Sequence, residues 1–411
     1  MNEQILSRLR RRLTESGVDA YLAYSPSSIY YTTGVQSFFI NEWWRMLGTV
    51  VALVPVDADS PVGMVIGDFE RGAAETSQVV GDVRTFRLWV ETRTADELSR
   101  PVGPSGEGMV VRPEQYDTDE QDHLLADMLR DRGLLAARIG TDREFLRAEH
   151  LERWRRIAPD VEWVDVTDDV YEVRSIKEPF ELDRLERAVR LSELGMTYAV
   201  SHLQAGMTAA HVRHLFGAGV TQAVLTRPEF RDYSDHWVLP GVGGGVSVGV
   251  ETEHSSGVED GDLIKFDCGT TIGGYRCDGG RTWAWRSVRP ESQRLHDVLC
   301  EAQQTAREMI RPGVPLREVF TAAVDHVRAN GYPRYSRGHV GHSVGIDTFH
   351  EEPPYISWQT EAVAEEGMVL AVEVPSYTPD VGAIMIEDMV VVHENGVRSL
   401  HTLPRSLEVV G

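Results

Sequence analysis

Four carboxylates set in apolar, strand-like runs constrain this chain more than any other feature of its sequence. Asp267 ends the apolar run that begins at residue 263, and Asp278 lies in the stretch that follows. The spacing predicts a β-hairpin with its turn at Ile272-Gly273, so that Asp267 pairs directly with Asp278. Side chains paired in this way point to the same face, with Cβ atoms about 5 Å apart. Two carboxylates so placed repel each other unless a proton or a cation lies between them.

A second pair of acids repeats this arrangement near the C-terminus. Glu373 ends the apolar run 369–372, and Glu387 ends the run 384–386. A hairpin centred on Asp380 places Glu373 opposite Glu387. Burying an unpaired carboxylate costs on the order of several kcal/mol. The two pairs therefore predict that the four acids share a cation.

A divalent metal ion removes the repulsion within both pairs. His342 supplies an imidazole, and the glycines around it, in residues 338–345, let the backbone approach a ligand closely. Carboxylate and imidazole ligands suit Mn²⁺, Zn²⁺, Co²⁺ or Fe²⁺. Four carboxylates and one histidine exceed the needs of a tetrahedral site, and they fit two ions about 3.5–4 Å apart that share bridging oxygens. Each residue alone is more often a turn or core residue, so the joint pattern carries the prediction of a metal centre.

The order of predicted elements divides the chain into two domains. Up to about residue 170, short apolar strands alternate with helices, as in α/β domains. Residues 25–28, Ser-Pro-Ser-Ser, are expected to break the chain after the first strand. We predict an α/β N-terminal domain over 1–170 and a second domain over 171–411. The expected helices cover 5–13, 119–132, 182–200, 292–310 and 316–330, and the expected strands cover 20–24, 48–55, 62–66, 137–140, 263–267, 275–285, 368–374 and 382–393.

Charge and composition exclude several classes of partner. A net charge of −23 disfavours nucleic acid and anionic membranes, both of which attract basic surfaces. No apolar run approaches the roughly 18 residues that span a bilayer, and the arginine cluster at 8–12 has no apolar run behind it, which argues against a secretory signal. Cys268, Cys277 and Cys300 show no CxxC spacing and predict reduced thiols in a cytoplasmic protein. The glycine-rich run 241–249 lacks the Lys-Ser/Thr of a phosphate loop and predicts a loop or a bulged strand.

The acid and histidine motifs resemble those of the pita-bread-fold metallopeptidases, which include aminopeptidase P, prolidase and methionine aminopeptidase, with creatinase as a metal-free relative. The five metal ligands of that family follow the order Asp, Asp, His, Glu, Glu, and all five match. The matching motifs are Asp267-Cys-Gly269, Gly274-Tyr-Arg-Cys-Asp278-Gly-Gly-Arg-Thr282, Gly341-His342-Ser-Val-Gly345, Val-Glu373-Val-Pro375 and Ile386-Glu387-Asp388. Residues 18–22, 29–34 and 173–179 resemble the N-terminal domain of prolidases and creatinase and the segment that opens their catalytic domain. The resemblance favours the aminopeptidase P, prolidase and creatinase branch, and it implies an α+β pita-bread catalytic domain over 171–411.

The resemblance also implies a role for each residue of the centre. It makes Asp267 a ligand of one ion, Asp278 and Glu387 bridges between both ions, and His342 and Glu373 ligands of the other. A water between the ions is then the nucleophile on an amide bond, and Glu373 carries its proton to the leaving nitrogen. His350 and His254 resemble family histidines that contact the substrate or its oxyanion. Two divalent ions are implied, manganese ahead of zinc, cobalt or iron, together with a short-peptide or small-molecule substrate and a homodimer.

Departures from the family pattern lie on the substrate side of the predicted pocket. Prolidases carry arginine where this chain has Met385, and the spacing from His342 to His350 is one residue longer. His339 lies one place from a family histidine, and the loop with His254 is shorter than in aminopeptidase P. These histidines and Met385 are the predicted substrate contacts. Three functions follow: an Xaa-Pro peptidase, an enzyme of the same family that acts on a small amide, amidine or zwitterion, and a binding protein on this fold.

Overall fold

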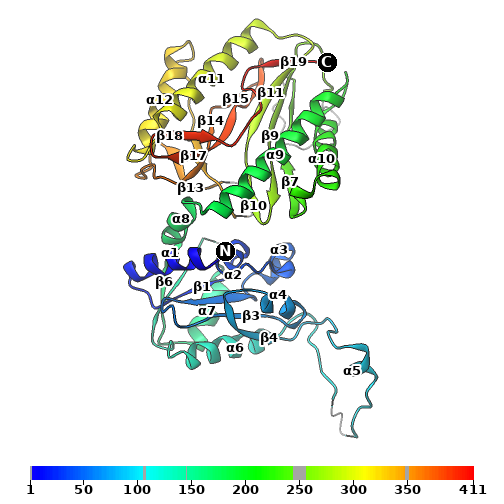
Figure 1. Cartoon of the computed structure of the whole chain (residues 1–411), viewed down its shortest axis with the longest axis vertical. Helices are drawn as coiled ribbons and strands as arrows, with labels where there is room; N and C mark the ends of the chain where they lie inside the picture. The colour runs from blue at the N-terminus through cyan, green and yellow to red at the C-terminus, as the bar shows by residue number, and fades with distance from the viewer. Residues whose placement is uncertain (1, 105–107, 145, 244–255, 348–350) are drawn as a thin grey trace. The chain divides into compact units, whose positions relative to one another are not determined.

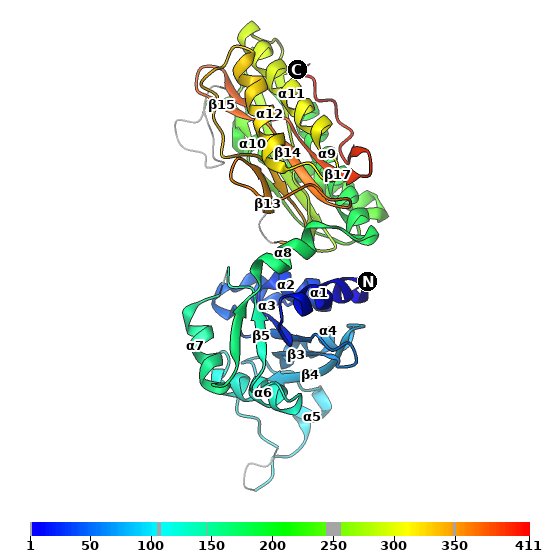
Figure 2. The same cartoon turned by 90° about the vertical axis from the view of Figure 1, so that its left-hand side faces the viewer.

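The computed structural model describes residues 2–104, 108–144, 146–243, 256–347 and 351–411, and it divides into two compact units. The first unit is Met1–Val173 and the second is Arg174–Gly411, so the division falls a few residues after the predicted boundary at 170. Figures 1 and 2 show the first unit in blue to cyan and the second in green to red. Each unit has its own sheet and its own buried residues.

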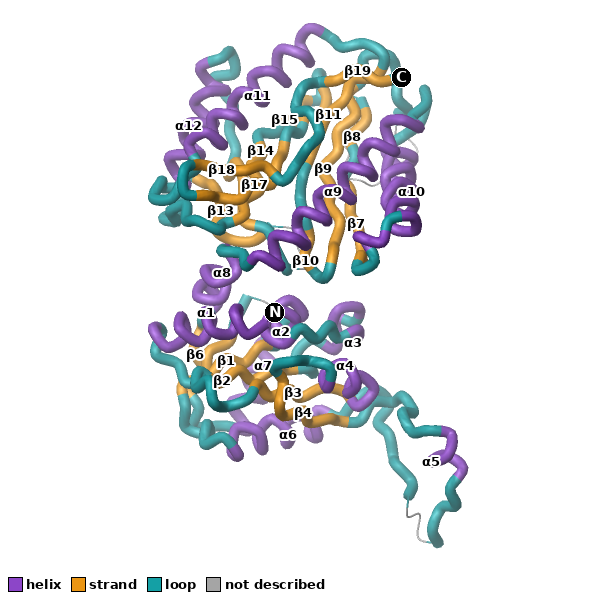
Figure 3. The backbone as a smooth tube through the Cα atoms, in the orientation of Figure 1, coloured by secondary structure: helices purple, strands orange, loops and turns teal. Residues whose placement is uncertain are grey.

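A six-stranded sheet forms the centre of the first unit, in the order β4-β3-β2-β1-β5-β6. The strands are β1 (Ala20–Ala23), β2 (Val51–Pro55), β3 (Val62–Gly67), β4 (Val80–Phe86), β5 (Arg138–Thr141) and β6 (Glu162–Asp165). The helices are α1 (Asn2–Glu15), α2 (Pro26–Thr33), α3 (Phe38–Glu42), α4 (Arg71–Glu75), α5 (Ala95–Ser99), α6 (Thr118–Asp131), α7 (Ala148–Ile157) and α8 (Thr167–Ser175). In Figure 3, α1 and α2 lie on one side of this sheet and α6 lies on the other. Parallel and antiparallel pairs both occur, and the predicted α/β class of this domain is confirmed.

The predicted chain break at residues 25–28 is the start of a helix. Ser25 caps α2, and its hydroxyl accepts a hydrogen bond from the Ser28 amide at 3.2 Å. Pro26 lies in the first turn, where its missing N–H removes no helical bond and its fixed φ suits the helix. The expectation of a break is therefore wrong, because Ser-Pro is also a signal that begins a helix.

The second unit contains an eleven-stranded sheet whose main path runs β10-β9-β11-β17-β14-β12-β13. Outside this path, β18 pairs with β17, β19 with β11, and β7 and β8 with β9. The strands are β7 (Tyr233–Val238), β8 (Gly241–Val242), β9 (Leu263–Ile272), β10 (Tyr275–Arg276), β11 (Gly280–Trp285), β12 (His339–Ser343), β13 (Glu352–Ser357), β14 (Val369–Glu373), β17 (Glu387–His393), β18 (Gly396–Ser399) and β19 (Glu408–Val410). A separate ribbon is formed by β15 (Ser376–Thr378) and β16 (Gly382–Ile384). In this order β11 lies beside β17, so the strands of residues 263–285 adjoin the strands of residues 369–393.

Two predicted strands are each divided in the structure. The strand expected over 275–285 is β10 and β11, with a break at 277–279, and the strand expected over 382–393 is β16 and β17, with a break at 385–386. Asp278 lies within the first break, and Glu387 directly follows the second. At the second break the Met385 amide donates to the side-chain hydroxyl of Thr282 on β11 at 2.8 Å, and not to a backbone carbonyl as in a strand ladder. Apolar alternation along the sequence does not signal such a change of partner.

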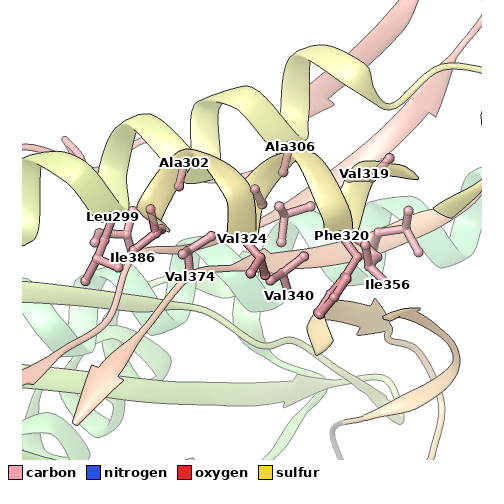
Figure 4. Close-up of a cluster of buried hydrophobic side chains, with 14 of the residues drawn as sticks. Leu299, Ala302, Ala306, Val319, Phe320, Val324, Val340, Ile356, Val374 and Ile386 are labelled. Atoms are coloured by element: carbon pink, nitrogen blue, oxygen red, sulfur yellow. The ribbon is translucent and has the colours of Figure 1, made fainter. Parts of the chain in front are cut away.

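Helices cover the sheet of the second unit in two pairs. They are α9 (Pro179–His202) with α10 (Ala209–Thr226), and α11 (Pro290–Met309) with α12 (Leu316–Ala329). Apolar residues of α11 recur at helical spacing, as in Leu299, Ala302 and Ala306, which gives the helix one buried stripe. Figure 4 shows this stripe packed with Phe320 and Val324 of α12 against the strands. Full burial of one such large apolar side chain contributes roughly 1.5–3 kcal/mol.

Alternation along the central strands separates the core from the acids. Val372, Val374 and Ile386 belong to the buried cluster under α11 and α12. Successive side chains of a strand point to opposite faces, so their neighbours Glu373 and Glu387 point away from these helices. The apolar runs that predicted these strands thus determine the face on which the carboxylates stand.

Cys268, Cys277 and Cys300 are free, and the first two are buried. Burial raises the pKa of the Cys277 thiol to about 12 and raises the pKa of the Cys268 thiol as well, so both stay protonated and packed at neutral pH. No helix in the described ranges combines the length and the apolar character that a bilayer span requires.

Candidate metal centre

Three of the predicted carboxylate ligands lie on one line across the sheet. The line runs through four paired residues: Asp267 of β9, Gly280 of β11, Glu387 of β17 and Glu373 of β14. Because paired residues share a face and neighbouring strands lie about 4.8 Å apart, the three acids point to the same side. The pairing of Glu373 with Glu387 confirms the hairpin predicted around Asp380.

The predicted direct pairing of Asp267 with Asp278 is wrong, because the turn lies one residue further along the chain. Tyr275 pairs with Ile272, which places the turn at Gly273-Gly274. These glycines have φ values of 53° and 82°. A two-residue turn that matches the twist of a hairpin needs positive φ at both central positions, and a β-branched residue such as isoleucine resists that conformation.

Asp278 still faces the same side as Asp267. The backbone bond from Cys277 N–H to Thr270 O, 3.0 Å, places Asp278 level with Gly269. Gly269 is two residues from Asp267 and therefore shares its face. A Cβ on Gly269 would lie 1.9 Å from the Cys277 carbonyl oxygen. The Asp-x-Gly pattern is thus required by the close approach of the two strands behind the acids.

His342 reaches the acids through an irregular stretch of β12. The pairing with β13 shifts register between His339 and His342, and Gly341 has a φ of 150° with no room for a Cβ, which would lie 2.2 Å from the Ala371 carbonyl oxygen. Residues three apart face opposite sides of a regular strand, but here both histidine rings lie together, with centroids 5.9 Å apart. His342 Nδ1 lies 2.9 Å from the Ser343 carbonyl oxygen. A carbonyl only accepts, so Nδ1 carries the proton and Nε2 keeps its lone pair.

Asp278, His342 and Glu387, named here the Asp278 cluster, offer ligand atoms that all lie within 4.8 Å of one another. His342 Nε2 is 3.6 Å from Asp278 Oδ2 and 4.0 Å from Glu387 Oε1. All three residues are buried, and within the described ranges Asp278 Oδ1 has no hydrogen-bond partner. A buried carboxylate oxygen without a partner, beside an imidazole lone pair, suits a divalent ion. The cluster therefore fits a metal site, and it contains three of the five predicted ligands.

The other two predicted ligands, Asp267 and Glu373, each contact a cationic side chain. Lys265 Nζ lies 2.8 Å from Asp267 Oδ2. Arg337 Nη2 donates to Glu373 Oε1 at 2.8 Å, and His339 Nδ1 lies 3.4 Å from the same oxygen. The sequence contained the signal for Lys265, which stands two residues before Asp267 in an apolar strand and so on the same face. It contained none for Arg337, which lies between α12 and β12 in a segment without a repeating pattern.

Burial and mutual repulsion dominate the electrostatics of the centre. Burial raises the pKa of Asp278 and Glu387 well above the ordinary carboxyl range, and the negative charges of neighbouring acids raise both further. Burial also raises the pKa of Glu373, against the opposing effect of Arg337 and His339. Carboxyl groups in this state retain a proton unless a cation replaces it. The centre thus has the protonation behaviour of a site that requires a cation at neutral pH.

The metal-free protein is expected to become less stable as pH rises above about 4, the ordinary carboxyl pKa. The folded-state pKa values of Asp278 and Glu387 lie above their unfolded values, so their contribution to the free energy of unfolding is complete below the unfolded pKa and is lost as pH rises through the folded pKa. Thermal unfolding between about pH 5 and about pH 8, with chelator and with excess Mn²⁺, tests this, because a bound ion stabilises the charged carboxylates. Glu387→Gln should flatten the metal-free profile. A wild-type profile that the substitution leaves unchanged contradicts the expectation.

Met385, a predicted substrate contact, is a buried neighbour of the acid line. The residue is 2% exposed. A Cβ on Gly280 would lie 2.1 Å from Met385 Cγ, so the methionine side chain fills the space that the glycine leaves between Asp267 and Glu387. The structure therefore places an apolar side chain beside the acids at the position where prolidases carry arginine.

His339, another predicted substrate contact, stands at the more open side of the centre. Its side chain is 25% exposed, and its Nε2 lies 3.9 Å from Glu351 Oε2. The ring packs edge-on against Tyr355, with centroids 5.5 Å apart. The remaining predicted contacts, His254 and His350, lie outside the described residues.

Known sequences and structures resemble both units of the chain. Residues 183–394 match the family model described as "Metallopeptidase family M24", and residues 5–176 match the family model described as "Creatinase/Prolidase N-terminal domain". An Xaa-Pro dipeptidase from Pyrococcus furiosus is 28% identical over 250 residues, which cover 60% of this chain and 68% of that protein. An X-Pro aminopeptidase structure from Thermotoga maritima has a TM-score of 0.75 at 22% identity, covering 98% of this chain and 99% of the other. An Xaa-Pro dipeptidase structure from Bacillus anthracis has a TM-score of 0.78 at 18% identity, covering 100% of both chains. At these identities the two structures show the fold, and they confirm the predicted α/β domain followed by a pita-bread domain.

Proposed function

Because the chain belongs to metallopeptidase family M24, we propose that it is a peptidase that depends on a dinuclear metal centre and hydrolyses an Xaa-Pro amide bond in a dipeptide or short peptide. The Asp278 cluster carries this proposal, since it joins a buried imidazole to two buried carboxylates, one of which, Glu387, belongs to the line of acids. Relatives named Xaa-Pro dipeptidase and X-Pro aminopeptidase support the substrate class. Manganese is the proposed ion, because oxygen ligands outnumber nitrogen ligands in this set.

In this proposal the Asp278 cluster holds the metal, and Asp267 and Glu373 complete the set of ligands. Divalent ions bound there supply Lewis acidity and lower the pKa of a water at the site. The buried apolar neighbours, Met385 among them, keep bulk water away from the acids and so strengthen their electrostatic effect on a bound substrate. The proposed metal centre is thus bordered by buried apolar side chains on one side and by the partly exposed ring of His339 on the other.

Glu373 is the proposed carrier of the proton from the attacking water to the leaving nitrogen. Its pKa is raised by burial, which brings a carboxyl group closer to the range in which it both accepts and returns a proton near neutral pH. Arg337 occupies Oε1 with a hydrogen bond of 2.8 Å, so Oε2 is the oxygen assigned to the proton. His339, whose Nδ1 lies 3.4 Å from the same Oε1, is the proposed substrate contact beside Glu373.

Met385 favours a second candidate function on the same centre. An apolar side chain at this position removes the guanidinium that the prolidase pattern supplies beside the substrate. A small amide, amidine or zwitterion that needs no such cation is then an alternative to the Xaa-Pro peptide. The choice between the two concerns the substrate and leaves the metal ligands unchanged.

A substrate panel on Mn²⁺-loaded protein separates these functions. We expect Xaa-Pro dipeptides or tripeptides to be hydrolysed at least about 10-fold faster, in kcat/KM, than the matched Xaa-Ala peptides, because one good pocket contact is worth roughly 1–3 kcal/mol. Creatine-like amidines and acylated diamino acids form the second arm. Faster turnover in that arm favours the second function, and metal-loaded protein without turnover of any member points to a binding protein.

A further inference from the structure

Lysine is nearly absent from this chain. Of its 41 lysine and arginine residues, only Lys177 and Lys265 are lysines. Both lysines lie in the second unit, and both are buried. Lys265 stands on β9 two residues before Asp267, on the face of the acids. A buried ammonium beside a predicted metal ligand opposes the binding of a cation there, because like charges repel at short distance.

The contacts of Lys265 hold its ammonium in this place. The side chain is 4% exposed, and Nζ lies 2.8 Å from Asp267 Oδ2. Nζ also donates to the Leu239 carbonyl oxygen at 3.1 Å and lies 5.3 Å from the centroid of the Tyr377 ring. A charge-assisted hydrogen bond and a cation–π contact both stabilise a desolvated ammonium. Asp267, like Glu373, is therefore a predicted ligand that already has a counter-ion within the chain, and its counter-ion is a buried lysine.

The charge balance of the centre supports the same conclusion. The four ionised acids, Asp267, Asp278, Glu373 and Glu387, carry four negative charges. Lys265 and Arg337 return two positive charges through contacts of 2.8 Å each. A buried site is least costly when its charges are compensated, and the two remaining negative charges match one divalent ion. Glu351 lies beyond His339, with 27% of its side chain exposed, where solvent screens its charge.

We propose that Lys265 is an internal counter-ion that makes the two metal positions strongly unequal. The first divalent ion binds at the Asp278 cluster. The second binds beside Asp267 after the Lys265 ammonium withdraws from Oδ2. Lysine suits this role, although arginine is the usual cation of this chain. Its compact ammonium on a flexible stem can move away from the carboxylate, whereas a guanidinium binds a carboxylate as a rigid fork. The inference rests on the proposed metal centre and specifies the order in which it fills.

Metal titration of the full chain tests this order without reference to activity. Equilibrium dialysis against Mn²⁺ with elemental analysis should show one tight equivalent in the wild type and a second that binds about 100-fold more weakly. Lys265→Met keeps the length of the side chain and removes its charge. We expect this variant to bind the second equivalent about 100-fold more tightly, and its electron paramagnetic resonance spectrum to show a spin-coupled Mn²⁺ pair at metal concentrations where the wild type shows a single ion.

Two control variants and the wild-type titration make the result decisive. Lys177→Met removes the other buried lysine, whose Nζ lies 3.3 Å from the Ser175 carbonyl oxygen and 3.2 Å from Ser343 Oγ, and it should keep the unequal steps. Asp267→Asn should abolish the second equivalent and keep the first. Two equivalents of equal affinity in the wild type overturn the inference even if Lys265→Met does not fold, and so does an unchanged second affinity in that variant. Wild-type protein that binds no Mn²⁺ contradicts the proposed metal centre itself.

Discussion

Asp278→Asn is expected to lower kcat/KM by about 1000-fold or more and to remove the tight equivalent of metal. Asparagine has the size of aspartate but no charge, and Asp278 contributes a carboxylate oxygen that lies 3.6 Å from His342 Nε2. The Lewis acidity of a bound ion is worth several kcal/mol of transition-state stabilisation, and about 1.4 kcal/mol corresponds to a factor of ten in rate. Steady-state kinetics and elemental analysis of the same preparation measure both losses.

The same substitution is expected to raise the melting temperature of the metal-free protein at neutral pH, which distinguishes a metal ligand from a structural acid. It removes a carboxylate that burial and its acidic neighbours make costly to ionise. Asp388 is the matched control: it is equally buried, but it accepts hydrogen bonds from Arg281 at 2.6 Å and Arg307 at 2.8 Å. Although burial raises the pKa of Asp388, the Arg281 charge and its neighbours hold that pKa at about 2.

Asp388→Asn should therefore lower the melting temperature with or without metal and leave the metal content unchanged, because it breaks a compensated ion pair. The opposite signs of the two variants in metal-free protein are the critical result. Equal shifts in one direction, or an Asp278→Asn enzyme that keeps its metal and its rate, would remove Asp278 from the centre.

Gly269→Ala is expected to destabilise the second unit by at least about 2–3 kcal/mol and to reduce metal binding with it. The added Cβ would lie 1.9 Å from the Cys277 carbonyl oxygen and 2.5 Å from Trp237 Nε1. Backbone lies on one side and the large, half-buried ring of Trp237 on the other, so the strands must separate beside Asp278. Denaturant unfolding of the metal-free protein, followed by metal titration, measures the two effects independently.

Gly338→Ala provides the matched control for this substitution. Gly338 also lies near a predicted metal ligand, but a Cβ there would meet no atom within 4 Å. We expect its stability to change by no more than about 0.5 kcal/mol, as is usual for surface substitutions. If both alanine variants have the stability of the wild type, the close approach of the strands behind the acids is not required.

The two acid hairpins show how far local patterns predict a register. The pairing of Glu373 with Glu387 was predictable, because apolar runs on both sides of the loop define one symmetric centre at Asp380. The turn of the first hairpin lies one residue beyond its predicted position at Ile272-Gly273. Both central residues of such a turn need positive φ, which Gly273-Gly274 adopts readily and Ile272 does not. Moving the turn by a whole residue keeps the alternation of faces, so Asp267 and Asp278 remained on one side although their partners changed.

Helices with strong amphipathic periodicity were predicted closely, and short elements were not. The structure has α11 at Pro290–Met309 and α12 at Leu316–Ala329, within two residues of the predicted ends. The strand β12 was not predicted, because it has no apolar alternation and depends on pairing with β13 and β14. The two histidines face the same side through the irregularity at Gly341, which a sequence pattern does not reveal.

The sequence by itself determined which acids are buried and on which face of their strands they stand, since apolar alternation is a local property of each strand. It also determined the order of the ligand motifs and the two-domain architecture. Only the tertiary structure decided which cations reach those acids. Lys265 is held in place by Leu239 and Tyr377, and Arg337 comes from a segment 36 residues before its partner Glu373. Such contacts depend on how distant segments pack around the sheet. They divide the five predicted ligands into a cluster of three that is suited to a metal ion and two acids that already have counter-ions.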